Sequence, residues 1–267
     1  MTLTLGSGPF SGHPGGDFNF RVDAPKHILY FEDSPRRVRV RLGGETIADT
    51  RAAKLMHETG HMPVIYFPQD AVRIDLLEPT DHSTHCPFKG DASYWTVRAA
   101  DREAENAVWS YSDPLEGAPP IRGYMAFRFD AMDTWLEEDE PIFGHPRDPY
   151  HRVDVREGSD HVRVLAGGEL LADTARPKLL FETGLPVRWY IPPDDVRTDL
   201  RTNSDTTTVC PYKGLAHYLT LAAGDRSIED LAFGYSEPFS EAVKVRDHFC
   251  FLHHELEVEV SDSPGDG

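Results

Sequence analysis

The chain has 267 residues and carries 27 Lys and Arg against 45 Asp and Glu, so its formal net charge is −18. Such an acidic chain repels phosphate backbones and anionic membrane surfaces, and we therefore expect neither a nucleic-acid partner nor a membrane partner. Its hydrophobic fraction of 39% is enough to build folded cores, which excludes wholesale disorder.

The N-terminus and the cysteines indicate the cellular compartment. Residues 1–12 have neither the basic start nor the apolar segment of a secretory signal. No apolar run approaches the ~20 residues that a membrane-spanning helix needs. The three scattered cysteines, Cys86, Cys210 and Cys250, argue against a disulfide framework. We therefore expect a cytoplasmic protein.

In chain order, an N-terminal arm (1–34) precedes a first predicted β domain (35–130). The domain opens with a predicted hairpin, because basic and apolar residues alternate over Arg37–Leu42 and a Gly-Gly turn leads into residues 45–49. Proline and glycine separate further short strands, which we predict at residues 64–67, 94–99, 107–111 and 124–129.

A linker is predicted over residues 131–158. Met132, Trp135 and Leu136 share one face at helical spacing, which predicts a short acidic helix over residues 131–140. Two motifs of the N-terminal arm recur in the linker, Gly-His-Pro (12–14 and 144–146) and Arg-Val-Asp (21–23 and 152–154), so a second arm is predicted there. A second β domain (159–258) and a disordered tail (259–267) complete the predicted organisation.

The second β domain is a copy of the first. Residues 38–129 align without a gap to residues 162–253, at an offset of 124, and about 40 of the 92 aligned pairs are identical. So long a period indicates two whole domains rather than a solenoid of small units. Fusion of an ancestral dimer produces such a chain, so we expect the two repeats to form an intrachain pseudo-dimer. The short strands predict an all-β, mainly antiparallel fold, with two sandwich-like domains in tandem.

The most distinctive motif retained in both copies is Cys-Pro-aromatic-Lys-Gly, which begins at Cys86 and at Cys210. In a tight turn the ammonium group of Lys89 or Lys213 approaches the thiol and lowers its pKa, as in a reactive cysteine. The alternative is structural, because Pro and Gly favour turns and a free Cys is commonly a small buried hydrophobe. No turn requires a lysine, so for the two lysines we favour a phosphate- or carboxylate-binding role.

Other polar pairs retained in both copies have a functional and a structural interpretation. Arg73 and Arg197 stand in Val-Arg-x-Asp-Leu segments, where a strand would place Arg and Asp on one face. They are interpreted either as anion-binding groups or as members of surface ion pairs. Glu58 and Glu182 lie in Glu-Thr-Gly turns, where the carboxylate is either a general base or an acceptor of backbone hydrogen bonds.

Three pairs of tyrosines complete the candidate site. They are expected to be core or rim aromatics that also wall a pocket for a planar ligand: Tyr66, Tyr94 and Tyr111, with Tyr190, Tyr218 and Tyr235 in the second copy. A metal site is not expected, because His82 and His85 have no counterpart in the second copy and no Cys-x-x-Cys pair is present. No cofactor motif is present either.

The order Glu-Thr-Gly, Tyr-x-Pro-x-Asp-x-Val-Arg-x-Asp-Leu, Cys-Pro-x-Lys-Gly-x-Ala-x-Tyr and Tyr-Ser-Asp/Glu-Pro resembles the domain-of-unknown-function family 427. The resemblance covers both copies and implies a tandem two-copy member with compact β-tent domains of the Mss4-like group. Relatives in that group bind structural zinc or hold small ligands against the sheet, but this chain lacks the paired cysteines for zinc. A nucleotidyltransferase label attached to the family implies a two-metal Asp-x-Asp motif, which is absent here.

Three functions are compatible with these residues. The first is binding of a small anionic or amide-bearing molecule by a pocket in each β domain. The second is an enzyme of unassigned reaction that uses the Cys, Lys, Glu and Arg residues. The third is a structural or interaction protein with a dimer-like pair of domains. We favour binding, because cationic residues are retained in both copies of a strongly acidic chain.

Overall fold

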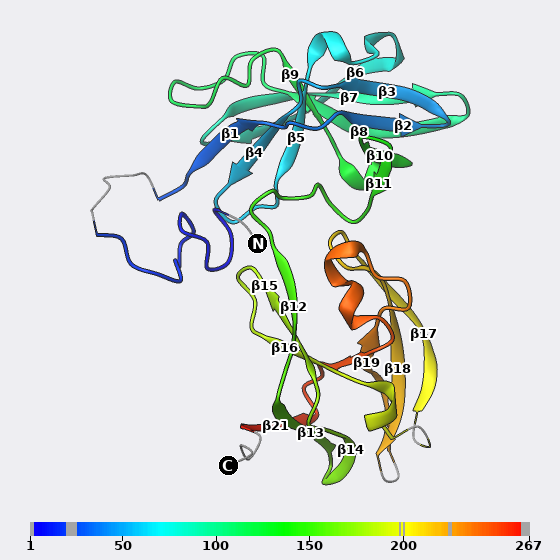
Figure 1. The fold of residues 1–267 in the computed structure, drawn as a ribbon. Helices are drawn as coiled ribbons and strands as arrows, with labels where there is room; N and C mark the ends of the chain where they lie inside the picture. The colour runs from blue at the N-terminus through cyan, green and yellow to red at the C-terminus, as the bar shows by residue number, and fades with distance from the viewer. Residues whose placement is uncertain (1–2, 20–25, 198, 200, 224–225, 263–267) are drawn as a thin grey trace. The chain divides into compact units, whose positions relative to one another are not determined.

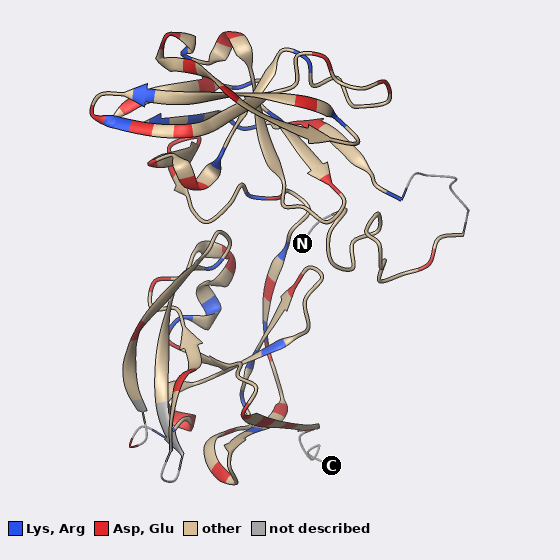
Figure 2. Ribbon diagram, turned by 180° about the vertical axis from the view of Figure 1, so that it is seen from behind, with Lys and Arg blue, Asp and Glu red and all other residues tan. Residues whose placement is uncertain are grey.

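The computed structural model describes residues 3–19, 26–197, 199, 201–223 and 226–262. The fold is all-β and antiparallel, as predicted, with short 3₁₀ turns between strands. The chain divides into two compact units, Met1–Tyr150 and His151–Gly267, which we describe separately. Among the described residues, no helix is both long enough and apolar enough to cross a membrane. Acidic residues are spread along the chain of both units (Figure 2).

The first unit has one large and one small sheet (Figure 1). The large sheet has the strand order β1-β4-β5-β9-β8-β7-β6 and the small sheet the order β11-β10-β2-β3. The strands are β1 (Leu29–Asp33), β2 (Val38–Leu42), β3 (Glu45–Thr50), β4 (Lys54–Glu58), β5 (Val64–Pro68), β6 (Leu77–Cys86), β7 (Gly90–Ala99), β8 (Arg102–Ser110), β9 (Tyr124–Phe127), β10 (Thr134–Glu137) and β11 (Glu140–Ile142).

The second unit repeats this arrangement with a smaller second sheet (Figure 1). Its large sheet has the order β12-β15-β16-β20-β19-β18-β17, and the small one has the order β14-β13-β21. The strands are β12 (Val153–Glu157), β13 (Asp160–Ala166), β14 (Glu169–Thr174), β15 (Lys178–Glu182), β16 (Arg188–Ile191), β17 (Arg201–Cys210), β18 (Gly214–Ala223), β19 (Arg226–Gly234), β20 (Phe249–Phe251) and β21 (Leu256–Asp262).

The alternation of side chains along each strand produces two apolar layers in each unit. In β5, Ile65 and Phe67 pack with β2 and β10 in the core between the two sheets, whereas Val64 and Tyr66 belong to the opposite face. That opposite face of the large sheet carries most of the tyrosines, and we call it the aromatic face. In the first unit it comprises Met56, Tyr66, Ala92, Tyr111, Ile121 and Ala126, flanked by Tyr94, Trp109 and Cys86.

The predicted hairpin is confirmed, but the helix predicted over residues 131–140 is wrong. β2 and β3 pair across the Gly-Gly turn with Val38, Val40 and Leu42 buried. The segment predicted as a connecting helix forms instead the strands β10 and β11, which extend the small sheet from β2. The buried Trp135 ring packs on Phe67 and donates from its indole N–H to the Phe129 carbonyl, so the sheet contacts determine its conformation.

The predicted disordered tail is also wrong for residues 259–262. These residues belong to β21, which pairs with β13 along its whole length. Residues 263–267 lie outside the described part of the chain. In the second unit β21 takes the place next to β13 that β10 takes next to β2 in the first unit.

Candidate functional site

A glutamate, a lysine and a histidine meet at one end of the aromatic face in the first domain. Lys89 forms an ion pair with Oε2 of Glu58, and Nε2 of His27 donates a hydrogen bond to Oε1 at 2.9 Å. The side chains of Lys89 and Glu58 are only 10% and 12% exposed. The His27 ring stacks on Phe88, the aromatic residue of the Cys-Pro-aromatic-Lys-Gly motif, at 3.8 Å.

The second domain builds the same cluster from equivalent residues. Lys213 pairs with Oε2 of Glu182, and His151 donates from Nε2 to Oε1 at 3.0 Å. The His151 ring stacks on Tyr212 at 4.0 Å. Burial is deeper here, because the side chains of Glu182 and Lys213 are 5% and 7% exposed. We call these two groups the Glu–Lys–His clusters.

Two turns hold each cluster together. The lysine follows a turn closed by a hydrogen bond from its N–H to the carbonyl of the cysteine, from Lys89 to Cys86 in the first domain. The next residue, Gly90, has φ of +103°, and a Cβ there would meet the Asp113 carbonyl oxygen at 3.3 Å. The other turn ties the histidine down, because the Thr59 hydroxyl accepts the N–H of Ile28, directly after His27. The motif residues are therefore explained in part by local structure.

Opposing electrostatic effects act on the two glutamates. Burial raises the pKa of each carboxyl group, but the hydrogen bonds and charges of the neighbouring lysine and histidine lower it by more. The net result holds the pKa of Glu58 below its ordinary value and lowers the pKa of Glu182 to about 2. Both glutamates are therefore ionised at neutral pH, and each forms a charge-matched pair with its lysine.

The structure brings together twelve of the fourteen predicted site residues, six in each domain. Around the first cluster, Cys86 and Tyr66 belong to the same apolar group as Tyr111, whose ring lies 5.9 Å from the Lys89 ammonium nitrogen. Tyr94 lies at the flank of this group, and its hydroxyl is hydrogen bonded to Thr84 at 2.9 Å. Tyr190, Tyr218, Tyr235 and Cys210 lie in the equivalent group of the second domain, where Tyr218 pairs with Thr208 at 3.1 Å.

The environment of these residues limits their chemistry. Burial raises the pKa of Tyr111 and Tyr235, so both phenols stay protonated near neutral pH. The Lys89 ammonium group is paired with the Glu58 carboxylate, so its charge is balanced by that carboxylate rather than by a Cys86 thiolate. The geometry therefore does not support the predicted activation of the thiol by the lysine.

Arg73 and Arg197 are not part of the clusters, and the strand predicted for the Arg73 segment is wrong. Arg73 precedes a 3₁₀ turn at Ile74–Leu76, and its side chain is 51% exposed. Its guanidinium group forms a bidentate ion pair with the Asp75 carboxylate, with a shortest N–O distance of 2.6 Å. Arg197 and Asp199 form the same pair. The surface interpretation thus describes both arginines, and they leave the candidate site.

The histidines of the clusters were missed in the sequence because the arms were aligned on the wrong motif. The Arg-Val-Asp match pairs residues 21–23 with 152–154, but residues 20–25 lie outside the described part of the chain. The structure shows instead that Leu29 pairs with Glu58 as Val153 pairs with Glu182. The offset of 124 therefore continues back to His27 and His151. Extending the ungapped alignment by eleven residues would have found them.

Each domain also has a surface cavity that reaches the tyrosine at the flank of the aromatic face. In the first domain a cavity of about 710 Å³ is lined by Tyr94, His82 and Asn106, together with two arginines, Arg102 and Arg128. In the second, a cavity of about 730 Å³ is lined by residues that include Asn203, Ser204, His217, Tyr218, Tyr235 and Ser236. Both cavities have the size of ordinary small-molecule sites.

A second cluster, specific to the first domain, surrounds a buried histidine. The side chain of His57, on β4, is fully buried. Its Nε2 lies 2.9 Å from Oε1 of Glu32, and its Nδ1 lies 3.9 Å from Oδ2 of Asp148. Tyr30 and Tyr150 donate to Oε2 of the same glutamate at 3.2 and 2.7 Å. The histidine therefore lies between two carboxylates and ties β1 to residues 148–150.

Replacing this histidine is expected to destabilise the first domain. His57→Phe installs the residue that the second domain has at the equivalent position 181. It leaves Glu32 without its hydrogen bond from the imidazole and Asp148 beside an apolar ring, so we expect the free energy of unfolding to fall by about 2–3 kcal/mol. Urea denaturation of the full chain measures this, with Tyr30→Phe as the control expected to cost less than about 1 kcal/mol. Equal stability of His57→Phe and the unaltered protein would contradict the interpretation.

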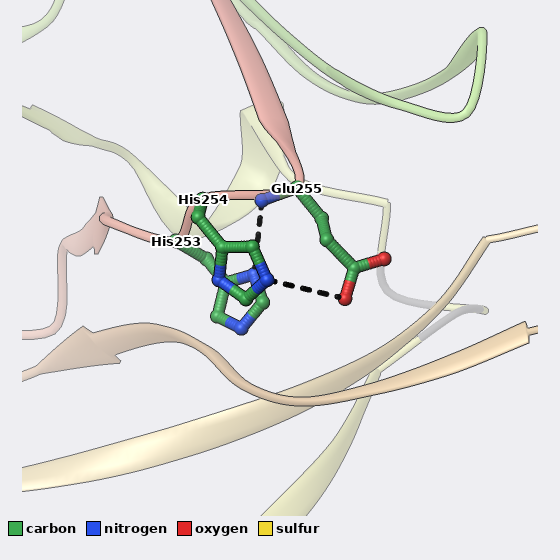
Figure 3. Close-up of side chains that lie close together, drawn as sticks. All are labelled: His253, His254 and Glu255. Carbon is green, nitrogen blue, oxygen red and sulfur yellow. Dashed lines mark hydrogen bonds and ion pairs between the residues drawn. The ribbon is translucent and has the colours of Figure 1, made fainter.

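One group in the described part of the chain has the side chains to hold a metal ion. His253, His254 and Glu255 stand in sequence ahead of β21, with their ligand atoms within 4.8 Å of one another (Figure 3). His254 is 83% exposed, and Nδ1 of His253 already accepts the backbone N–H of Glu255. The first domain has no equivalent group of histidines at this point of its sequence.

The fold and the repeated cluster describe a protein made of two copies of one β domain. The family described as "Domain of unknown function (DUF427)" matches the chain twice, over residues 30–138 and 154–262. The chain therefore belongs to this family, as a tandem two-copy member, which confirms the resemblance seen in the sequence. A comparison with curated proteins finds no match.

Proposed function

We propose that each β domain binds a small, amide-bearing molecule in the cavity beside Tyr94 or Tyr218. The observation that carries this proposal is a ligand-sized cavity that reaches the equivalent tyrosine in each domain, while the other lining residues stand at different positions in the two domains. Each cavity presents an aromatic ring, an asparagine amide and a histidine, which together offer hydrogen-bond donors and acceptors beside a flat apolar surface.

The charges around the cavities favour a neutral ligand over an anion. In the first cavity Arg128 pairs with Asp130 and Arg102 pairs with Asp133. In the second cavity the charged lining residues are Asp205 and Asp247. Neither lining offers an uncompensated cation, and the lysines of the Glu–Lys–His clusters are matched by their glutamates. Of the two ligand classes expected from the sequence, the amide-bearing one is therefore preferred.

The Glu–Lys–His clusters support this proposal in a second way. A buried ion pair contributes little net stability, because desolvation offsets the attraction of the charges. The two domains have diverged, yet both retain such a pair beside their tyrosines. We therefore infer that the pair is retained for the geometry that it imposes rather than for stability. In this proposal the cluster fixes the end of the aromatic face, with Lys89 held beneath the Tyr111 ring.

Benzamide is a suitable probe, because it combines a flat ring with one amide. Ligand-observed NMR of the full chain should detect two binding sites. Tyr94→Leu and Tyr218→Leu each remove a ring and a hydroxyl from one cavity, and each should weaken one site at least tenfold, as expected for losing both a stacking surface and a hydrogen bond. Arg73→Met is the matched control, since Arg73 is outside the cavity residues. Absence of benzamide binding, or unchanged binding to both leucine variants, would refute the proposal.

A further inference from the structure

The aromatic face of the second domain differs from that of the first at several positions, three of which are neighbours and change chemical character. Val64, Trp109 and Ala126 of the first domain are replaced by Arg188, Phe233 and Cys250. The three replacements are adjacent across the strands β16, β20 and β19. They also surround one tyrosine that both domains share, Tyr66 in the first and Tyr190 in the second. These three replacements therefore change the surroundings of that tyrosine.

The register of the strands places these side chains together. Cys250 is the direct cross-strand neighbour of Tyr190 on one side and of Phe233 on the other. Arg188 lies two residues before Tyr190 on β16 and so has its side chain on the same face of the sheet. Its guanidinium carbon lies 5.9 Å from the centre of the Phe233 ring.

The polar groups brought together here can all donate a hydrogen bond, and none of them is a carboxylate. A guanidinium group donates and never accepts. Burial raises the pKa of the Cys250 thiol to about 12, so the sulfur keeps its proton near neutral pH. The Tyr190 side chain is fully buried, and its hydroxyl has no hydrogen-bond partner among the described residues. A buried unpartnered hydroxyl costs free energy, so its retention calls for a reason.

No carboxylate of the residues that the structure describes is available to this group. In the first domain the Trp109 ring packs edge-on against Tyr66, with ring centres 6.5 Å apart, and the phenyl ring of Phe233 lacks the indole N–H that Trp109 has there. The nearby carboxylate of Glu182 is engaged by both Lys213 and His151. In the described part of the chain no carboxylate forms an ion pair with Arg188.

We propose that the second domain binds a small carboxylate at Arg188 and Tyr190, through a site that the first domain lacks. The guanidinium offers two parallel N–H groups to the two carboxylate oxygens, and the buried hydroxyl donates to one of them. The ring of Phe233 provides a flat wall beside the guanidinium. The site uses residues other than those lining the cavity at Tyr218, so it goes beyond the proposed amide site and is tested separately from it.

Benzoate, with benzamide as its uncharged analogue, tests this site by isothermal titration of the full chain. One benzoate should bind per chain. Arg188→Val, which restores the residue of the first domain, should weaken benzoate at least tenfold, the loss expected for a charged hydrogen-bonding pair. Tyr190→Phe removes only the hydroxyl. It should weaken benzoate about threefold or more without lowering the melting temperature, because the apo protein loses an unpartnered polar group.

The reciprocal variant tests whether these residues suffice. The triple change Val64→Arg, Trp109→Phe and Ala126→Cys gives the first domain the residues of the second, and it should raise the stoichiometry from one benzoate to two. Benzoate that fails to bind the unaltered protein, or that binds Arg188→Val with unchanged affinity, overturns the proposal. Benzamide binding that persists in Arg188→Val shows that the site at Tyr218 is intact, so failure of one proposal is distinguished from failure of the other.

Discussion

Lys213→Met is expected to lower the free energy of unfolding of the second domain by about 3–5 kcal/mol, the usual cost of leaving one member of a buried ion pair without its partner. The change keeps most of the aliphatic chain and removes the ammonium group, so the effect reports on charge rather than on packing. Glu182 then retains only the His151 hydrogen bond as compensation in a site that is 5% exposed. Guanidinium denaturation of the full chain, followed at tyrosine and tryptophan wavelengths, measures the loss.

Two further variants separate the effect of the lost charge from that of lost packing. Lys244→Met changes an exposed lysine of the same domain and should alter stability by less than about 0.5 kcal/mol. The double variant Glu182→Gln/Lys213→Met removes both charges and should be more stable than Lys213→Met alone, because no uncompensated charge remains. A double variant as unstable as the single one would show that Lys213 stabilises the domain by packing. It would contradict the inference that the ion pair is retained for its geometry.

The hairpin was predictable because a single local signal determined it. Strict alternation over residues 38–42 has one solution, a strand with one face buried. The segment around Trp135 was ambiguous, because three apolar residues within ten fit both a helical stripe and a short strand. Its conformation depends on contacts with Val40 and Phe67, which are far away in sequence. Single-sequence periodicity cannot detect such contacts.

The candidate site was likewise predicted only in part. Identity between the copies selected Glu58, Cys86, Lys89 and the tyrosines, and the structure places these retained residues close together. It also selected Arg73, whose retained partner is only Asp75 on the adjacent surface. The alternation rule misled here, since Val-Arg-x-Asp-Leu reads as a strand but the backbone forms a 3₁₀ turn. Buried His57 was not predicted because it has no counterpart in the second copy.

Glu182 is also expected to make the second domain unusually sensitive to acid. Its pKa is about 2 in the folded protein against an ordinary value of 4.5, since the His151 hydrogen bond and the Lys213 charge outweigh the effect of burial. A depressed carboxyl pKa stabilises the folded state fully above the unfolded value, and the stabilisation is lost as the pH falls from about 4.5 towards 2. The side chain is almost fully buried, so this difference corresponds to about 3 kcal/mol.

Denaturation midpoints measured between pH 7 and pH 2 test this expectation. In the unaltered protein the unfolding free energy of the second domain should decline steeply below pH 4.5. In Glu182→Gln it should start lower at pH 7, because Lys213 has lost its partner, and it should decline less steeply through the same range. Glu58→Gln is the matched variant in the first domain, where the pKa is also lowered but the cluster is more exposed, so its slope should change less. If the unfolding free energies of the unaltered protein and of Glu182→Gln fell in parallel with pH, Glu182 would not be the cause of the acid sensitivity.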